Sequence, residues 1–170
     1  MRLIYRSAAL AAATFSLLVL AACDPQRISE LKEGVSTEAD VRDRFGAPEN
    51  VWDEPGGART FEYNRQPAGQ VNYMITIGPD GRMTALRQVL TPETFARVSP
   101  GMRMDEVRRL LGKPAKVTPY ELKKETWADW RYLEAPNQSK VFTVVYGPDQ
   151  FVLRTQTGVD TDAPEFKGGK

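Results

Sequence analysis

Hydrophobic and polar side chains alternate with a period of two along residues 71–77, which predicts a half-buried β-strand. One side of this strand would carry Val71, Tyr73, Ile75 and Ile77, and the other side Asn72, Met74 and Thr76. Gly78-Pro79-Asp80-Gly81 follows as a tight hairpin signal, so 83–90 is predicted to be the return strand. Residues 59–64 are predicted to form an earlier strand with Phe61 and Tyr63 on one side.

A helical spacing precedes these strands. Val41 and Phe45 lie four residues apart and therefore share one face of a helix. Ser36 or Thr37 is the expected N-cap, and acidic residues follow in the first turn, where the helix dipole favours them. The Gly-Ala-Pro stretch 46–48 ends the helix, because glycine is common just after a helix and proline prevents continuation.

The same features occur twice along the chain, in the same order. The matched blocks are 34–48 with 101–114, Phe61 and Tyr63 with Trp130 and Tyr132, and 73–80 with 142–149. Such ordered self-similarity indicates a tandem duplication. The second copy then predicts a helix with Val107, Leu110 and Leu111 on its apolar face, and strands over 125–133, 140–146 and 151–157. A short helical turn is expected before each copy, over 28–32 and 92–98.

The fold class that follows is α+β, with each repeat consisting of two helices packed on an antiparallel meander. Repeat 1 is expected to span 28–91 and repeat 2 to span 92–159. The polar, glycine-containing end 160–170 is predicted to be a disordered tail.

The N-terminus carries a targeting pattern. Arg2 and Arg6 precede an apolar run from Ala8 to Ala22, which predicts a secretory signal peptide over 1–22. A transmembrane anchor is the alternative, but 15 apolar residues are fewer than the roughly 20 that a spanning helix needs. Leu20-Ala21-Ala22-Cys23 resembles the lipobox of bacterial lipoproteins, in which the cysteine is lipidated and becomes the mature N-terminus. Residues 23–27 would then be a tether.

The lipobox, the Gly-x-Pro helix ends and the aromatic strand Trp130-Arg131-Tyr132 together resemble the SmpA/OmlA/BamE lipoprotein family. This resemblance implies an outer-membrane, periplasm-facing protein whose partners are envelope proteins such as β-barrel assembly subunits. The chain departs from the family by carrying two repeats, and Asp24 after the cysteine leaves an inner-membrane location open. Two tandem copies also resemble the β-lactamase-inhibitor-protein fold, which implies a helix layer on one curved sheet.

Composition argues against several function classes. Removing Arg2 and Arg6 from the 23 Lys and Arg leaves 21 basic against 22 acidic side chains, a balance that does not attract nucleic acid. The chain has no histidine, the commonest general base and metal ligand. We therefore expect no enzyme activity, no catalytic residues, no metal, no cofactor and no small-molecule substrate.

A partner-binding surface is expected on the outer face of the second sheet. Its predicted members are Trp127, Arg131, Val141, Thr143 and Val145, with Met74 at the corresponding face of the first copy. An exposed apolar strip of this kind is typical of a protein-binding surface. Burial of the strip between the two repeats is the alternative. The aromatic residues Phe61, Tyr63, Trp130 and Tyr132 are predicted to be core residues.

The functional expectation is a non-enzymatic lipoprotein that acts as a protein-interaction module, accessory to outer-membrane β-barrel assembly and envelope integrity. The alternative is an inhibitor of a periplasmic hydrolase that inserts loop 64–70 or loop 134–139. Lipid head-group binding is a third reading, and its basic residues would be Arg103, Arg108, Arg109 and Lys113, although solvation of a helix face also explains those charges.

Overall fold

The computed structural model describes residues 28–164. The predicted signal peptide 1–22, the lipidation site Cys23, the tether 23–27 and the end of the tail, 165–170, lie outside the described residues. The chain divides into two units, Met1–Leu31 and Lys32–Lys170. In the first unit Ile28 and Ser29 are helical, and the Leu31 amide donates to the Ile28 carbonyl at 3.1 Å.

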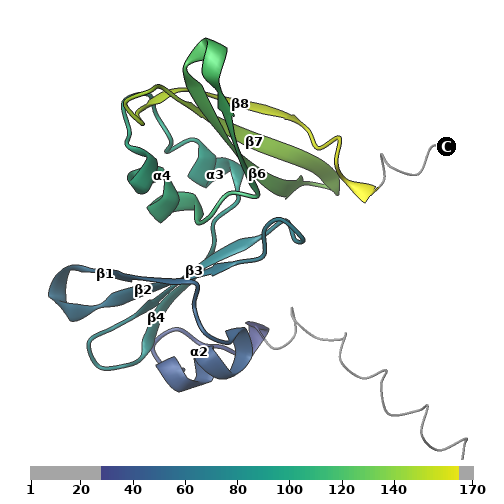
Figure 1. Ribbon diagram of the computed structural model, residues 1–170. Coiled ribbons are helices and arrows are strands. Elements are labelled where there is room, and N and C mark those ends of the chain that lie inside the picture. The colour runs from purple at the N-terminus through teal and green to yellow at the C-terminus, as the bar shows by residue number, and fades with distance from the viewer. Residues whose placement is uncertain (1–27, 165–170) are drawn as a thin grey trace, which may run out of the picture. The chain divides into compact units, whose positions relative to one another are not determined.

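The second unit contains an antiparallel sheet whose strands follow chain order (Figure 1). Its strands are β1 (Asn50–Asp53), β2 (Arg59–Asn64), β3 (Asn72–Ile77) and β4 (Met83–Gln88). A short 3-10 turn, Pro55–Gly57, joins β1 to β2. The expected hairpin turn is confirmed, since the Gly78 amide donates to the Arg82 carbonyl at 2.8 Å.

A second antiparallel sheet has the same strand order. Its strands are β5 (Lys116–Tyr120), β6 (Glu125–Glu134), β7 (Gln138–Tyr146) and β8 (Val152–Val159). A 3-10 turn, Glu121–Lys123, closes the hairpin between β5 and β6. Both sheets thus contain one strand more than the sequence predicts, because β1 and β5 were not anticipated.

The expected fold class, α+β with two tandem helix-helix-meander repeats forming a helix layer on one curved sheet, is wrong. The molecule is dominated by two separate four-stranded antiparallel sheets with few, short helices. The sheets do not join, since no strand of β1–β4 pairs with a strand of β5–β8, and α3 and α4 lie between β4 and β5 in the chain. Glycine stops after α2 and α4 limit each of these helices to eight residues, too short to form a covering layer.

Three α-helices are present in residues 32–164: α2 (Glu38–Phe45), α3 (Pro92–Phe95) and α4 (Met104–Leu111). Thr37 caps α2 in a capping box with Asp40, which decides between the two predicted caps. The Thr91 hydroxyl caps α3 as expected, accepting from the Thr94 amide at 3.3 Å. The backbone after α2 turns at Gly46, with φ of 80°, and after α4 at Gly112, with φ of 75°.

The first sheet packs one face against α2. Val41 and Phe45 from the helix and Phe61 and Tyr63 from β2 are all buried. The Phe45 and Tyr63 ring centroids lie 4.9 Å apart, and the Tyr63 hydroxyl donates to the Gly46 carbonyl at 3.1 Å. The predicted core role of Phe61 and Tyr63 is therefore confirmed.

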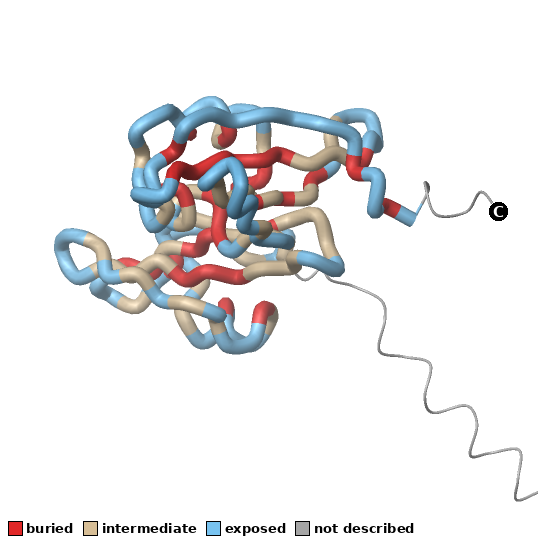
Figure 2. Tube along the Cα trace, turned by 45° about the horizontal axis from the view of Figure 1, so that its top comes forward, coloured by how far each residue is buried: buried red, intermediate tan, exposed pale blue. Residues whose placement is uncertain are grey.

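The second sheet packs its inner face against α3 and α4. Phe95 stacks on Phe142 with a centroid distance of 4.2 Å, and the indole of Trp130 donates to the Gly112 carbonyl at 2.9 Å. Trp130 and Tyr132 are 1% and 2% exposed, which confirms their predicted core role. Figure 2 shows the buried positions concentrated along the central strands.

The core of the second sheet also takes in residues from the first half of the chain. Met74 from β3, and Val89 and Leu90 after β4, belong to the same buried hydrophobic cluster as Leu111 and Trp130. The first sheet therefore packs one face on α2 and contributes Met74 from its other face to the core of the second sheet.

Candidate partner-binding site

The predicted surface strip is largely internal. Met74, Thr143 and Val145 are 7%, 6% and 0% exposed, so the expectation that they form an exposed strip is wrong. Met74 is covered because its face of β3 meets the second half of the chain, which is the alternative that the sequence left open.

Val145 is buried for a different reason. It lies between Trp127 on β6 and Arg154 on β8 in the strand register. The Arg154 guanidinium lies 6.0 Å from the centre of the Trp127 ring, so these two long side chains meet above the valine. Long side chains with apolar stems often cover hydrophobic surface in this way.

Arg131, Val141 and Thr143 form the other end of the predicted strip. Arg131 is engaged twice, through an ion pair with buried Asp160 at 2.6 Å and a bond to the Pro67 carbonyl at 2.8 Å. The Thr143 hydroxyl donates to Asp129 at 2.6 Å, and Val141 is half-buried. The polar groups of Arg131 and Thr143 are thus taken up by Asp160, Asp129 and loop 64–70.

Loop 64–70, one of the two segments expected to insert into a hydrolase, is held by the second sheet. The Gln66 amide nitrogen donates to the Arg131 carbonyl at 2.7 Å, and Gln70 donates to the Ser139 hydroxyl at 3.1 Å. The other expected segment, 134–139, is an exposed turn that ends at buried Ser139. These bonds hold loop 64–70 on the second sheet, while Pro67 and Ala68 at its tip stay exposed.

Exposed hydrophobic side chains lie on several elements, and two of them, Tyr120 and Leu122, lie at the β5–β6 hairpin. Leu122, at the turn, is fully exposed, and Tyr120 is 40% exposed. Tyr120 lies against half-buried Trp127 with a centroid distance of 4.9 Å. Lys123 and Arg154 lie over these rings, with the Lys123 ammonium 5.4 Å from the Trp127 centroid. We call Tyr120, Leu122, Lys123, Trp127 and Arg154 the tip patch.

Hydrogen bonds and an ion pair with Glu125 hold Trp127 and Arg154 of the tip patch in place. Glu125 accepts two hydrogen bonds from Arg154, at 2.7 and 3.0 Å, and one from the Trp127 indole at 2.9 Å. The Arg154 bond and then the Trp127 bond lower the pKa of the Glu125 carboxyl to about 2. The charged form is thereby favoured, and it fixes the orientation of the Trp127 ring.

Sequence reasoning found Trp127 but missed the rest of the tip patch. The turn is formed by a 3-10 segment followed by Lys124 in the left-handed region, with φ of 52°. The signal in the sequence is a single leucine inside Tyr120-Glu121-Leu122-Lys123-Lys124, where the charged neighbours leave Leu122 without a core to enter.

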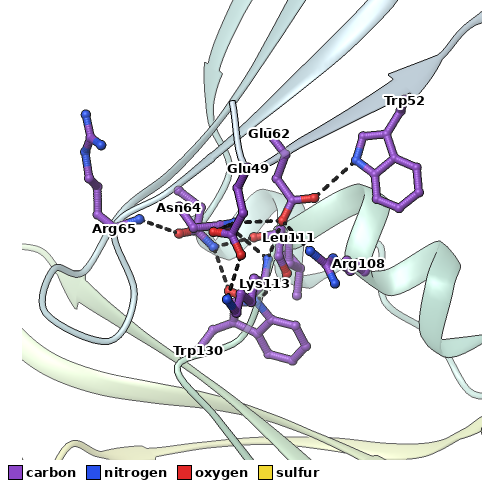
Figure 3. Close-up of polar contacts among 11 residues, drawn as sticks. Glu49, Trp52, Glu62, Asn64, Arg65, Arg108, Leu111, Lys113 and Trp130 are labelled. Carbon is purple, nitrogen blue, oxygen red and sulfur yellow. Dashed lines mark hydrogen bonds and ion pairs between the residues drawn. The ribbon is translucent and has the colours of Figure 1, made fainter. Parts of the chain in front are cut away.

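A second polar centre joins the two halves of the chain (Figure 3). Glu62 on β2 is fully buried, and its carboxylate accepts from the Trp52 indole at 3.2 Å, the Asn64 amide at 2.8 Å and the Lys113 backbone amide at 2.9 Å. Arg108 lies 3.3 Å from the same carboxylate. Buried charges require such partners, and here the partners come from both halves.

Asn72 completes this centre. Its side-chain nitrogen donates to the carbonyls of Leu111 and Lys113 at 2.8 and 3.1 Å, and its oxygen accepts from the Arg65 amide at 3.2 Å. The C-terminal end of α4 is thus docked on the first sheet by hydrogen bonds. We name Trp52, Glu62, Asn64, Asn72, Arg108 and Lys113 the junction, and the hydrogen bonds of Glu62 and Asn72 give it a structural role.

The basic residues considered for lipid head groups are also engaged by the protein. Arg103 pairs with Asp105, Arg108 with Glu62 and Lys113 with Glu49, while Arg109 lies 4.7 Å from the centre of the Trp52 ring. This arrangement favours the alternative in which these charges serve the helix and the junction.

Within residues 28–164, no three His, Cys, Asp or Glu side chains are grouped to hold a metal ion. None of the helices described there has the length and apolar character needed to cross a membrane.

No protein-family model and no curated protein matches the sequence. Two solved structures resemble it. A DUF4309 family protein from Bacillus subtilis is 23% identical, with 80% of this chain and 86% of that chain covered and a TM-score of 0.31. A candidate β-lactamase inhibitor protein from Streptococcus mutans is 9% identical, with 72% and 82% covered and a TM-score of 0.34.

The resemblance to the SmpA/OmlA/BamE family receives no support from these comparisons. The name of the second structure agrees with the resemblance to the β-lactamase-inhibitor-protein fold that the tandem repeat suggests. TM-scores at this level carry no conclusion about what this chain binds.

Proposed function

We propose that this chain is a non-enzymatic, lipid-anchored periplasmic protein that binds a partner protein through the tip patch. The observation that carries the proposal is the fully exposed Leu122 at the hairpin turn that follows Tyr120, whose ring lies against Trp127. Tyr120, Trp127 and Arg154, which accompany this leucine in the tip patch, are of the residue types that contribute most to binding hot spots.

The lipid anchor at Cys23 is the second part of the proposal. Attachment to a membrane raises the local concentration of the binding domain, so a small contact surface suffices. Replacing Cys23 with Ser is expected to move the protein from the membrane fraction to the soluble fraction on cell fractionation. Retention of C23S in the membrane fraction would contradict the anchor.

The more specific form of the proposal is an accessory role in outer-membrane β-barrel assembly, on the periplasmic side of the outer membrane. An inner-membrane location remains the alternative because of Asp24. Only the identity of the partner distinguishes this role from other envelope functions.

Photo-crosslinking identifies that partner. A photoreactive amino acid at position 122 of the full chain, activated in the native envelope, should yield a protein adduct that mass spectrometry can name. β-Barrel assembly subunits in the adduct would support the specific role, and other envelope proteins would support only the general one. Adducts with lipid alone would contradict a protein partner.

A matched pair of variants tests the surface. Leu122→Asp is expected to reduce partner recovery about tenfold, because a hot-spot side chain contributes roughly 1–2 kcal/mol or more. Leu133→Asp is the control, since Leu133 is 50% exposed but lies outside the tip patch. Equal recovery by both variants, with unchanged melting temperatures, would overturn the proposed surface.

Inhibition of a periplasmic hydrolase is the second candidate function. The observation that favours it is the position of Leu122 at a narrow hairpin turn, from which it could enter a substrate groove. The purified chain should then inhibit a member of a panel of periplasmic hydrolases, and L122D should not. Absence of inhibition across the panel would leave the tethered binding module as the proposal.

A further inference from the structure

A cavity of about 390 Å³ lies between α4 and the inner face of the second sheet. Met104 and Arg108 from α4, Ala128 and Trp130 from β6, and Tyr146 from β7 contribute to its lining. The segment 113–117 forms its remaining wall. Its volume falls within the range of small-molecule sites, about 300–1,000 Å³.

Two residues that line this cavity carry buried polar atoms without a partner. Tyr146 is fully buried, and its hydroxyl makes no hydrogen bond. The Nε atom of Arg108 is likewise buried and unpaired, although another nitrogen of that guanidinium reaches Glu62. Buried polar groups normally have partners, so an unpaired donor needs an explanation.

The charged side chains that line the cavity are all basic. Arg108, Lys113 and Lys116 contribute positive charge, and the lining includes no carboxylate. Arg108 and Lys113 are partly balanced by Glu62 and Glu49 of the junction. Lys116 is exposed and pairs with no carboxylate in residues 28–164. The walls between these cations are apolar side chains.

We propose that this cavity binds a small amphipathic carboxylate, such as a medium-chain fatty acid, with its alkyl chain against the apolar walls. The carboxylate oxygens would accept from the Tyr146 hydroxyl and the Arg108 Nε–H, and Lys116 would attract the anion at the rim. Charge-assisted bonds of this kind are stronger than neutral ones. The site shares no residue with the tip patch, so the two proposals succeed or fail independently.

Titration calorimetry with octanoate tests the site. The full chain is held in nanodiscs, and heats from empty nanodiscs of the same lipid are subtracted. Octanoate is expected to bind with one site per chain, while octanamide, which lacks the charge, binds at least tenfold more weakly. Equal affinity for octanoate and octanamide, or no saturable octanoate binding, would overturn the proposal.

Three variants locate the binding. Tyr146→Phe should weaken octanoate binding about tenfold without lowering the melting temperature, because it removes only an unpaired hydroxyl. Lys116→Glu, at an exposed position, should weaken octanoate and strengthen octylammonium binding. Tyr120→Phe, outside the cavity, is the control. If Y146F and K116E both bind octanoate as tightly as Y120F does, the cavity is not the site.

Discussion

At the scale of single residues, the clearest contrast is between two glutamates in the same neighbourhood. Glu62 is fully buried, with donors from both halves of the chain, and Glu49 is half-exposed, with Lys113 at 2.6 Å. Burial makes the first carboxylate dependent on its partners, since water cannot replace them. Solvent screens the second, whose ion pair is of the kind that contributes little.

Glu62→Gln is therefore expected to lower the free energy of unfolding by about 2–4 kcal/mol, because a neutral amide leaves buried donors without a charged acceptor. Glu49→Gln should lower it by no more than about 1 kcal/mol. Urea unfolding of the two variants measures both values. Equal effects would mean that Glu62 is less dependent on its partners than its burial indicates.

Glu125 provides a pH-dependent prediction. Its pKa of about 2 in the folded protein lies below the ordinary value of 4.5, chiefly because of the bonds from Arg154. The stabilisation is therefore present above pH 4.5 and is lost as the pH falls towards 2. The indole N–H resonance of Trp127, followed by NMR, should titrate with a midpoint near 2. In Glu125→Gln this titration should vanish, and a midpoint near 4.5 in the unaltered protein would contradict the pairing.

At the scale of elements, the helix ends were predictable from sequence and the sheet edges were not. The Gly-x-Pro pattern marks where α2 and α4 stop, since Gly46 and Gly112 adopt φ values that favour glycine. In contrast, β1 and β5 are short and lack a clear alternation, and β5 contains Pro119. Hydrogen bonding to β2 and β6 holds β1 and β5 in the extended conformation, which their own sequences do not strongly favour.

The sequence also could not show which face of each strand is covered by other parts of the protein. Alternation shows that Met74 and Val145 point away from Ile75 and Val144, but it does not show what covers that side. Met74 meets the core cluster shared by both halves, and Val145 lies beneath Trp127 and Arg154. Because Met74 and Val145 are buried, the candidate site lies at the β5–β6 turn and not at these two residues.

The two helix-stop glycines allow an element-scale prediction. Gly46 and Gly112 have ψ of −158° and −171° with positive φ, a region that is essentially restricted to glycine. A Cβ on Gly46 would meet nothing within 4 Å, whereas a Cβ on Gly112 would lie 2.5 Å from the Asn64 side-chain oxygen and 3.0 Å from the Asn72 nitrogen. Gly112 is thus constrained by the junction as well as by its own backbone.

Gly46→Ala should cost about 1–3 kcal/mol of unfolding free energy through backbone strain alone. Gly112→Ala should cost at least about 1 kcal/mol more, because the methyl group displaces junction side chains. Thermal unfolding at matched concentrations compares them. If Gly46→Ala proves the more costly, α4 is not docked as tightly as the Asn64 and Asn72 contacts indicate.

At the scale of the whole molecule, the shared core and the junction argue that the two sheets unfold together. Met74 from the first sheet lies in the cluster of the second, and Asn72 donates to the end of α4. Separating the halves would expose apolar surface and leave Glu62 without its Arg108 and Lys113 partners. The sequence repeat indicated two similar pieces but could not indicate this dependence, which arises from contacts far apart in the chain.

Hydrogen exchange measures the coupling directly. Ile75 is fully buried in the first sheet, and Ile75→Ala should lower stability by about 2–5 kcal/mol. If unfolding is cooperative, the slowest amides of β7, in the other sheet, should lose protection by the same free energy as those of β3. Unchanged protection in β7 would show that the second sheet stays folded when the first opens, and the junction would then be a contact between two independent pieces.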